Sequence, residues 1–429
     1  MPKLDARLSR RGLLPLGLLP LGLAAALAAG CGGGDGGATA VTTPPPAAVP
    51  RAFVSGQSAS TVIGQADFTG TTANQGGAAS ASTLNSPNQL ALASDGRLFV
   101  ADVANHRALV YGAIPASANA AATLAVGQGN LTDTFNPAPP TSSSLSTASG
   151  VAVSGTRMAV VDTSNHRVLL FNTIPTVSGA PADLVLGQGT QTSNAPGCHE
   201  KMLRGPNAVA ITPDGKIIVS DAGNHRVMIW NAWPVINGPR ADVVLGQQSL
   251  FTCQPNDADG NGATDAASAA TLASPASVWS DGTRLLVADT ANSRVLAWDQ
   301  LPAAGAHGTP ADRVLGQVGM TTTAANDTDG DDITDMASAA TLNQPRGVHS
   351  DGTRIVVADW LNHRVLVWNT WPAPDGAAAD LVLGQPNFTA TTAGSGSAQF
   401  NRPSAALISG DDLLVSDRLN HRVLVFKAQ

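Results

Sequence analysis

Short runs of apolar residues recur along the chain from about residue 60 to its end, and turn-forming residues bound each run. Residues 98–101 (Leu-Phe-Val-Ala) and 167–171 (Arg-Val-Leu-Leu-Phe) are rich in β-branched and aromatic side chains, which is typical of strands. A turn such as Asp95-Gly96 precedes the first kind of run, and a further run lies before the turn, as at 207–211. No stretch beyond residue 40 keeps a helical period, so the pattern predicts an all-β fold.

These runs belong to a unit that occurs six times. Each unit contains four strand signals, a Gly-Gln pair and a D-x-x-N-x-R segment, and these segments begin 58 to 70 residues apart. The repeated residues are Asp102, Asn105 and Arg107; Asp162, Asn165 and Arg167; Asp221, Asn224 and Arg226; Asp289, Asn292 and Arg294; Asp359, Asn362 and Arg364; Asp417, Asn420 and Arg422. A four-stranded unit cannot bury both of its faces alone, so six such units predict a β-propeller with six four-stranded blades.

The pattern Leu-x-x-Pro, then Asp-Gly, then Val-Ala-Asp-x-x-Asn-His-Arg-Val resembles the NHL repeat family of six-bladed β-propellers. The resemblance covers nearly all of residues 59–429, which we take as one propeller domain. It implies the fold, whereas that family includes RNA-binding modules, protein-binding modules and lyases. The chain ends in a third-strand signal (422–426) and begins with a lone outer-strand signal (61–65). The N-terminal strand is therefore expected to complete the sixth blade and close the ring, which removes exposed strand edges.

The first residues read as an export signal. Residues 1–30 contain Ser9-Arg10-Arg11, an apolar run and small residues before Cys31, which resembles a twin-arginine signal that ends in a bacterial lipobox. We expect lipidation at Cys31 and a flexible tether over residues 31–58, which are rich in glycine and proline. The predicted location is the cell envelope, with the membrane contacted through the lipid only.

Charge and cysteine content narrow the function. Charged residues make up 13% of the chain, its net charge is −7 and it has no long basic run, which argues against nucleic acid as a partner. Cys198 and Cys253 are the only cysteines besides Cys31. In an exported protein such a pair favours a disulfide.

The D-x-x-N-x-R segments invite a catalytic interpretation, but a catalytic centre is needed only once. Residues present in every blade are better explained by a structural role. We expect the Asp to accept backbone N–H groups, the Asn to take a left-handed turn position, and the Arg to hold a carboxylate or carbonyl. The His that follows the Asn in five units can bridge to the next blade, and Ser293 replaces it in the fourth.

Two units are longer than the others, and their additional residues are acidic. They resemble calcium loops because alternate oxygen-bearing side chains present ligands on one side of a tight turn. The predicted calcium ligands are Asp257, Asp259, Asn261 and Asp265 in the first loop and Asp327, Asp329, Asp331 and Asp335 in the second. Asp332 stands where the first loop has Gly262, and Ser268 and Ser338 stand where a calcium loop has its last Glu.

Three functional hypotheses follow. The first is a scaffold in the cell envelope that binds a protein or glycan partner through the face that carries the acidic loops and both cysteines, with calcium stiffening the loops. The second is a metal-dependent lyase or hydrolase with its site in the propeller channel, near which His349 is expected. The third is a purely structural role.

Overall fold

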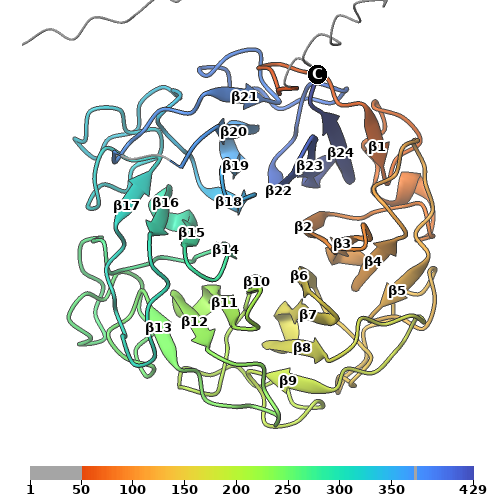
Figure 1. Cartoon of the computed structure of the whole chain (residues 1–429), viewed down its shortest axis with the longest axis horizontal. Coiled ribbons are helices and arrows are strands. Elements are labelled where there is room, and N and C mark those ends of the chain that lie inside the picture. The colour runs from red at the N-terminus through yellow and green to blue at the C-terminus, as the bar shows by residue number, and fades with distance from the viewer. Residues whose placement is uncertain (1–50, 372–373) are drawn as a thin grey trace, which may run out of the picture. The chain divides into compact units, whose positions relative to one another are not determined.

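The computed structural model describes residues 51–371 and 374–429, so the predicted signal peptide, Cys31 and most of the predicted tether lie outside the described residues. Six four-stranded sheets stand around a common centre (Figure 1). This confirms the predicted all-β, six-bladed propeller. The helical segments among the described residues are short 3-10 turns, and none of them is long and apolar enough to cross a membrane.

Each blade is an antiparallel meander from an innermost to an outermost strand. The strands of blades one to three are β2 (Pro87–Leu92), β3 (Leu98–Asp102), β4 (Arg107–Tyr111) and β5 (Leu124–Val126); β6 (Ala148–Ser154), β7 (Arg157–Asp162), β8 (Arg167–Phe171) and β9 (Leu184–Leu186); β10 (Ala208–Ile211), β11 (Ile217–Asp221), β12 (Arg226–Trp230) and β13 (Val243–Leu245). Those of blades four to six are β14 (Ser277–Ser280), β15 (Leu285–Asp289), β16 (Arg294–Trp298) and β17 (Arg313–Leu315); β18 (Pro345–Ser350), β19 (Ile355–Asp359), β20 (Arg364–Trp368) and β21 (Leu381–Leu383); β22 (Pro403–Ser409), β23 (Asp412–Asp417), β24 (Arg422–Lys427) and β1 (Thr61–Ile63).

The ring closes as predicted, because β1 pairs with β24 in register Thr61 to Val425. The closure extends further toward the N-terminus than expected. The backbones of Ala52 and Gln429 exchange two hydrogen bonds of 3.0 Å, and Phe53 is only 4% exposed within the core. Residues 52 and 53, which were predicted to belong to the tether, thus contact the ring, where Phe53 buries its apolar surface.

Apolar side chains pack between the blades. Six core clusters are present, and each joins neighbouring blades; one brings Val168 of blade two against Met228 and Trp230 of blade three. Most strands are therefore buried on both faces, as stacked blades require. Most of the exposed side chains therefore lie in the connections at the two ends of the ring.

The two ends differ in their connections. We call one end the turn face: it carries the D-x-x-N-x-R turns between second and third strands and the long loops that follow each Gly-Gln pair. We call the other end the hairpin face: it carries the hairpins between first and second strands and the loops between third and fourth strands. A meander places alternate connections at alternate ends, so both acidic loops lie on the turn face.

Candidate functional site

The repeated turn has the same conformation in all six blades. A 3-10 turn follows each Asp: η2 (Val103–Asn105), η3 (Thr163–Asn165), η4 (Ala222–Asn224), η5 (Thr290–Asn292), η6 (Trp360–Asn362) and η7 (Arg418–Asn420). The residue after the Asn is left-handed, with φ between 52° and 55°. The expectation that the Asn takes the left-handed position is therefore wrong. The Asn stays in the 3-10 turn because its side chain donates to the Asp carboxylate.

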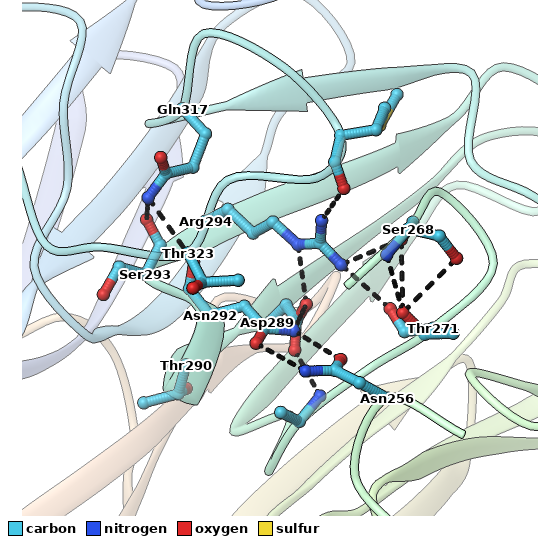
Figure 2. Close-up of polar contacts among 12 residues, drawn as sticks. Asn256, Ser268, Thr271, Asp289, Thr290, Asn292, Ser293, Arg294, Gln317 and Thr323 are labelled. Atoms are coloured by element: carbon cyan, nitrogen blue, oxygen red, sulfur yellow. Dashed lines mark hydrogen bonds and ion pairs between the residues drawn. The ribbon is translucent and has the colours of Figure 1, made fainter. Parts of the chain in front are cut away.

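Blade four shows the network around this turn (Figure 2). Oδ2 of Asp289 accepts hydrogen bonds from Nδ2 of Asn292 and Nε of Arg294, both at 2.8 Å, and Oδ1 accepts the backbone N–H of Ala273 at 2.7 Å. Asp289 and Arg294 are both 0% exposed. Burying an ion pair is costly unless further hydrogen bonds satisfy it, and here they do. The other five blades repeat the Asp–Arg pair at 2.7 or 2.8 Å.

The same Arg and the Gln of the Gly-Gln pair hold the long loops. Nη2 of Arg294 donates to the carbonyls of Ser268 and Thr271, both at 3.0 Å, and Nη1 donates to the carbonyl of Met320. Nε2 of Gln317 donates to the carbonyl of Ala324 at 2.7 Å. Ser268, which stands where a calcium loop has its last Glu, therefore belongs to the repeat network. The loops start and end on a rigid base.

The histidines bridge neighbouring blades. Nδ1 of His225 in blade three accepts the backbone N–H of Ser274 at the start of blade four, at 3.0 Å. Nδ1 of four further histidines accepts the equivalent backbone N–H at 3.0 or 3.1 Å: His106, His166, His363 and His421. Burial is the main cause that lowers the pKa of each of these histidines below its ordinary value. They are neutral acceptors, and this geometry supports a structural role for the repeated segment.

The first acidic loop is folded around its own carboxylates. Asp257, which is buried, accepts the backbone N–H groups of Gly260 at 2.8 Å and Gly262 at 3.0 Å. Asp259, which is exposed, accepts that of Asn261 at 3.0 Å, and Asp265 accepts that of Ala258 at 2.9 Å. The side chain of Asn261 donates to Asp259 and accepts the backbone N–H of Ala263, so its oxygen turns along the loop.

The second loop has the same conformation. Asp327 accepts the backbone N–H groups of Gly330 at 2.7 Å and Asp332 at 3.1 Å, and Asp335 accepts that of Thr328. The predicted ligands Asp329 and Asp331 are exposed and accept the N–H groups two residues further on. Asp332 adopts φ of 62° in place of Gly262 at 86°, so the substitution leaves the tight turn intact.

Each loop gathers three carboxylates. Asp257, Asp259 and Asp265 offer oxygens within 4.8 Å of one another, and so do the equivalent residues of the second loop, Asp327, Asp329 and Asp335. Carboxylate oxygens at this spacing are hard ligands of the kind that Ca²⁺ takes. Each loop is joined to the repeat network by a pair of amides, such as Asn256 with Asn292 at 2.9 and 3.0 Å. An ion bound in either loop would therefore be connected to the buried repeat network through this pair of amides.

The disulfide lies beside the first loop. Cys198 and Cys253 are bonded, as predicted, and they tie the loop that precedes blade three to the loop that precedes blade four. A cavity of about 330 Å³ is lined by this disulfide, Asn261 and Phe251, whose side chain is 63% exposed. The neighbouring loop exposes Ile333 and Met336. The turn face thus places acidic groups next to exposed apolar side chains.

The propeller channel holds a second cavity, of about 550 Å³, lined by residues of all six innermost strands and of the hairpin face. Gln89 of blade one crosses the channel and exchanges two hydrogen bonds with the backbone of Val209 in blade three. His349 lines this cavity, as expected, and burial lowers its pKa to about 4 although Asp351 opposes the shift. Asp351 itself is paired with Arg354 at 2.6 Å.

The described residues of the channel include no group of three metal-ligating side chains. Among the described residues, the groups of three or more His, Cys, Asp or Glu side chains close enough to share a metal ion are the two in the acidic loops. His199 lies outside the channel, in the loop of Cys198, where its carbonyl accepts from Arg226. Trp279 packs edge-on to His349 with ring centroids 6.3 Å apart. His349 is thus a neutral side chain in a mostly apolar pocket.

Comparison with known proteins agrees with the architecture. The NHL repeat family model matches residues 203–230, which run from the start of blade three to the end of its third strand. No curated protein matches the chain. These residues contain the Asp221, Asn224 and Arg226 set, so the match falls on the repeat network described above.

Several solved structures are similar to this chain at low sequence identity. A structural genomics protein of unknown function from Bacteroides thetaiotaomicron is 12% identical (TM-score 0.46; 87% of this chain, 75% of that one). Hydrazine synthase from Kuenenia stuttgartiensis is also 12% identical (0.45; 82% and 98%). An auxiliary nutrient binding protein from Bacteroides thetaiotaomicron is 12% identical as well (0.43; 80% and 69%). At these values the matches assign no activity or partner to this chain.

Proposed function

Because the chain is a six-bladed propeller that carries the NHL repeat, we propose that it is a binding scaffold whose turn face holds a protein or glycan partner, with calcium in the two acidic loops. The fold itself supports a scaffold or binding role. The observation that carries the proposal is the asymmetry of the ring: within residues 51–371 and 374–429, the two carboxylate triads and the disulfide all lie on the turn face. Loops on a rigid scaffold commonly bind partners.

Calcium would fix these loops in one conformation. The carboxylate oxygens of Asp259, Asp265 and their counterparts in the second loop lie in exposed segments, and the negative charges repel one another without a cation. Binding of Ca²⁺ removes that repulsion and lowers the entropy that the loops lose when a partner docks. Residues beside the loops, such as Phe251 and Met336, supply exposed apolar surface for the contact.

We further propose that the protein works outside the cytoplasm, attached to the membrane by a lipid on Cys31. The disulfide between Cys198 and Cys253 supports an oxidising compartment. The signal and the lipidated cysteine lie outside the described residues, so mass spectrometry of the mature N-terminus is the test. A mature chain that begins at Cys31 with two or three acyl chains is expected, and an unmodified N-terminus would remove the anchor.

The calcium proposal is tested by elemental analysis of the protein purified without chelator. We expect about two calcium ions per chain, from one ion per loop. The variant with Asp257, Asp259, Asp327 and Asp329 changed to Ala should contain none. Calcium in that variant, or its absence from the wild type together with no response to added calcium in titration calorimetry, would contradict the proposal.

The partner is tested with a photo-crosslinking amino acid at single positions in cells. At Met336 on the turn face we expect a calcium-dependent crosslinked product. At Val235, which is 87% exposed on the hairpin face, we expect none, so this position is the matched control. Crosslinking from Val235 and not from Met336 would place the binding surface at the other end of the ring.

A further inference from the structure

Three arginines converge on one tryptophan at the turn face. The guanidinium carbons of Arg346, Arg402 and Arg418 lie 4.3, 5.7 and 5.8 Å from the ring centroid of Trp360. Arg346 is in β18 and Arg402 directly precedes β22, the innermost strands of blades five and six, which lie side by side at the centre of the ring (Figure 1). Trp360 and Arg418 open the 3-10 turns of the same two blades, and Trp360 is only 6% exposed.

None of the three guanidinium groups has a partner for its charge. Within residues 51–371 and 374–429, no carboxylate pairs with them and no acceptor bonds to their nitrogen atoms. Nε of Arg346 is buried without any hydrogen bond. Leaving a buried charged donor unsatisfied is costly, and the repeat arginines show how this fold otherwise treats a buried guanidinium, with every direction occupied.

The electrostatics show that the positive charge is concentrated. Burial, with the charge of Arg402 added, lowers the pKa of Arg346. Burial, with the charge of Arg346 added, lowers the pKa of Arg418 to about 10. The three cations therefore repel one another in a protein whose net charge is −7. One aromatic face attracts a cation, but it supplies no negative charge to offset three.

The other blades carry no arginine at the positions of Arg346, Arg402 and Arg418. The position of Arg346 is occupied in the other blades by small or neutral side chains, namely Asn88, Ser149, Asn207, Ala276 and Ser404. Arg402 stands at a left-handed position, with φ of 55°, where the other blades have the uncharged residues Ser86, Thr147, Gly205, Ser274 and Gln344. Blades five and six thus depart from the repeat at neighbouring positions.

Another arginine of the chain shows the contrast. The guanidinium carbon of Arg284 lies 4.4 Å from the ring centroid of Trp371, as close as that of Arg346 to Trp360. Arg284 is paired with Asp281 at 2.7 Å and also donates to the carbonyl of Gly352 at 2.8 Å. At Trp371 the stacked Arg284 is therefore neutralised by a carboxylate, whereas the three arginines at Trp360 have none.

We propose that Arg346, Arg402 and Arg418 form a binding site for an oxyanion, the carboxylate or phosphate group of a small ligand, over Trp360 beside the propeller axis. Each guanidinium presents a planar fork of donors that matches two oxygens of such a group. The anion supplies the acceptors and the negative charge that the cluster lacks. The site uses no residue of the acidic loops, so it stands independently of calcium.

The test follows the indole N–H signal of Trp360 by NMR in the full chain labelled with ¹⁵N-tryptophan. The chain has 7 tryptophans, and Trp360→Phe assigns the signal. Sodium phosphate or sodium malonate is added in metal-free buffer at constant ionic strength, with sodium chloride as the balancing salt. We expect a saturable shift with phosphate, with malonate or with both, and the probe that saturates at the lower concentration identifies the anion as a phosphate or a carboxylate.

Single variants test the residues. Arg402→Gln and Arg418→Gln should each raise the dissociation constant about tenfold, the value of one charge-assisted hydrogen bond. Arg402 is exposed, so its variant retains the fold. Arg284→Gln, which removes the neutralised stacked arginine, should leave the dissociation constant unchanged. A shift that stays linear for both probes and equals that of chloride, or dissociation constants that are the same in both variants and the wild type, would overturn the proposal.

Discussion

Aspartates do two different things in this molecule. In the D-x-x-N-x-R turns, six of them are 0% exposed, and their oxygens accept from an Arg, an Asn and a backbone N–H within the same blade. In the two acidic loops, Asp259, Asp265, Asp329 and Asp335 are exposed, and carboxylates of different residues face one another. A repeated carboxylate with its own paired Arg belongs to the scaffold, whereas carboxylates that face one another without a paired cation among the described residues have charge to offer a ligand.

The largest loss of stability is expected when the buried Asp–Arg network of one blade is broken. In Arg167→Leu, Asp162 loses its ion pair of 2.7 Å, and the carbonyls of Thr141 and Ser144 lose their donor. Breaking a buried pair from one side leaves an uncompensated charge, so the free energy of unfolding should fall by about 3–5 kcal/mol. Urea unfolding followed by tryptophan fluorescence measures the change.

The control is an arginine on the hairpin face. Arg97 pairs with Asp95 at 2.8 Å, but Asp95 is half exposed, so Arg97→Leu should change the free energy of unfolding by less than about 1 kcal/mol. If Arg167→Leu costs no more than Arg97→Leu, the buried network is not a stabilising element and the comparison fails.

A smaller effect with a defined pH dependence is expected at the blade bridges. His225→Ser removes the acceptor for the backbone N–H of Ser274 and should cost about 1 kcal/mol at pH 7.5. Burial lowers the pKa of His225 in the folded protein below 6.5, so the unfolded chain takes up the proton first as the pH falls. The stability that neutral His225 provides is therefore complete above pH 6.5 and is lost below it.

The measurement is the difference in Tm between the wild type and His225→Ser across pH 5 to 8. Taking the difference cancels other titrating groups, including Asp417, whose pKa burial raises to about 6. We expect the difference to shrink as the pH falls below 6.5. A difference that grows on acidification would mean that the protonated His225 is the stabilising form.

Blade four lacks the bridging histidine, so a bridge can be added there instead of removed. Blade four has Ser293 at the same left-handed position, with φ of 52°. Ser293→His should place an acceptor near the backbone N–H of Gln344 and raise stability by up to about 1 kcal/mol, less where the buried site must adjust to the larger side chain. Thermal unfolding at pH 7.5 tests this expectation. A lower Tm would show that blade four has no room for the imidazole side chain.

Much of this architecture was predictable because it is periodic. The turn residues and the Gly-Gln pair recur in all six blades, so one repeat can be compared with another within a single sequence. The N-terminal strand was predictable because the last repeat lacks its fourth strand. The local conformation of the turn was harder to predict. The sequence suggested Asn for the left-handed position, but the Asn side chain donates to the Asp carboxylate, and the residue after it adopts the left-handed conformation. Packing of Phe53 against the ring had no periodic signal at all.

The arginine cluster was missed for the opposite reason. Arg346, Arg402 and Arg418 are far apart in the sequence and each looks like an ordinary surface charge. The fold brings them to Trp360 because adjacent blades place their innermost strands and their 3-10 turns side by side. Aligning the six repeats position by position would have shown that blades five and six differ from the rest there.

The smallest effect is expected in the acidic loops without calcium. In the double variant Asp259→Asn and Asp329→Asn, each change keeps the side-chain oxygen that accepts the N–H two residues further on and removes one exposed charge. Without metal, the free energy of unfolding of the double variant should therefore differ from that of the wild type by less than about 0.5 kcal/mol. Chelator-treated wild type and variant, unfolded in urea side by side, give the number.

Calcium should stabilise the wild type more than the double variant. With free calcium at 100 times its dissociation constant, one occupied site stabilises the wild type by about 2.7 kcal/mol, and the variant should gain much less because each loop has lost one carboxylate. Arg167→Leu, in contrast, should lose the same stability with or without calcium, since no acidic loop contacts its network. If calcium stabilises the double variant as much as the wild type, the exposed carboxylates are not its ligands, and both sets of aspartates would then be scaffold.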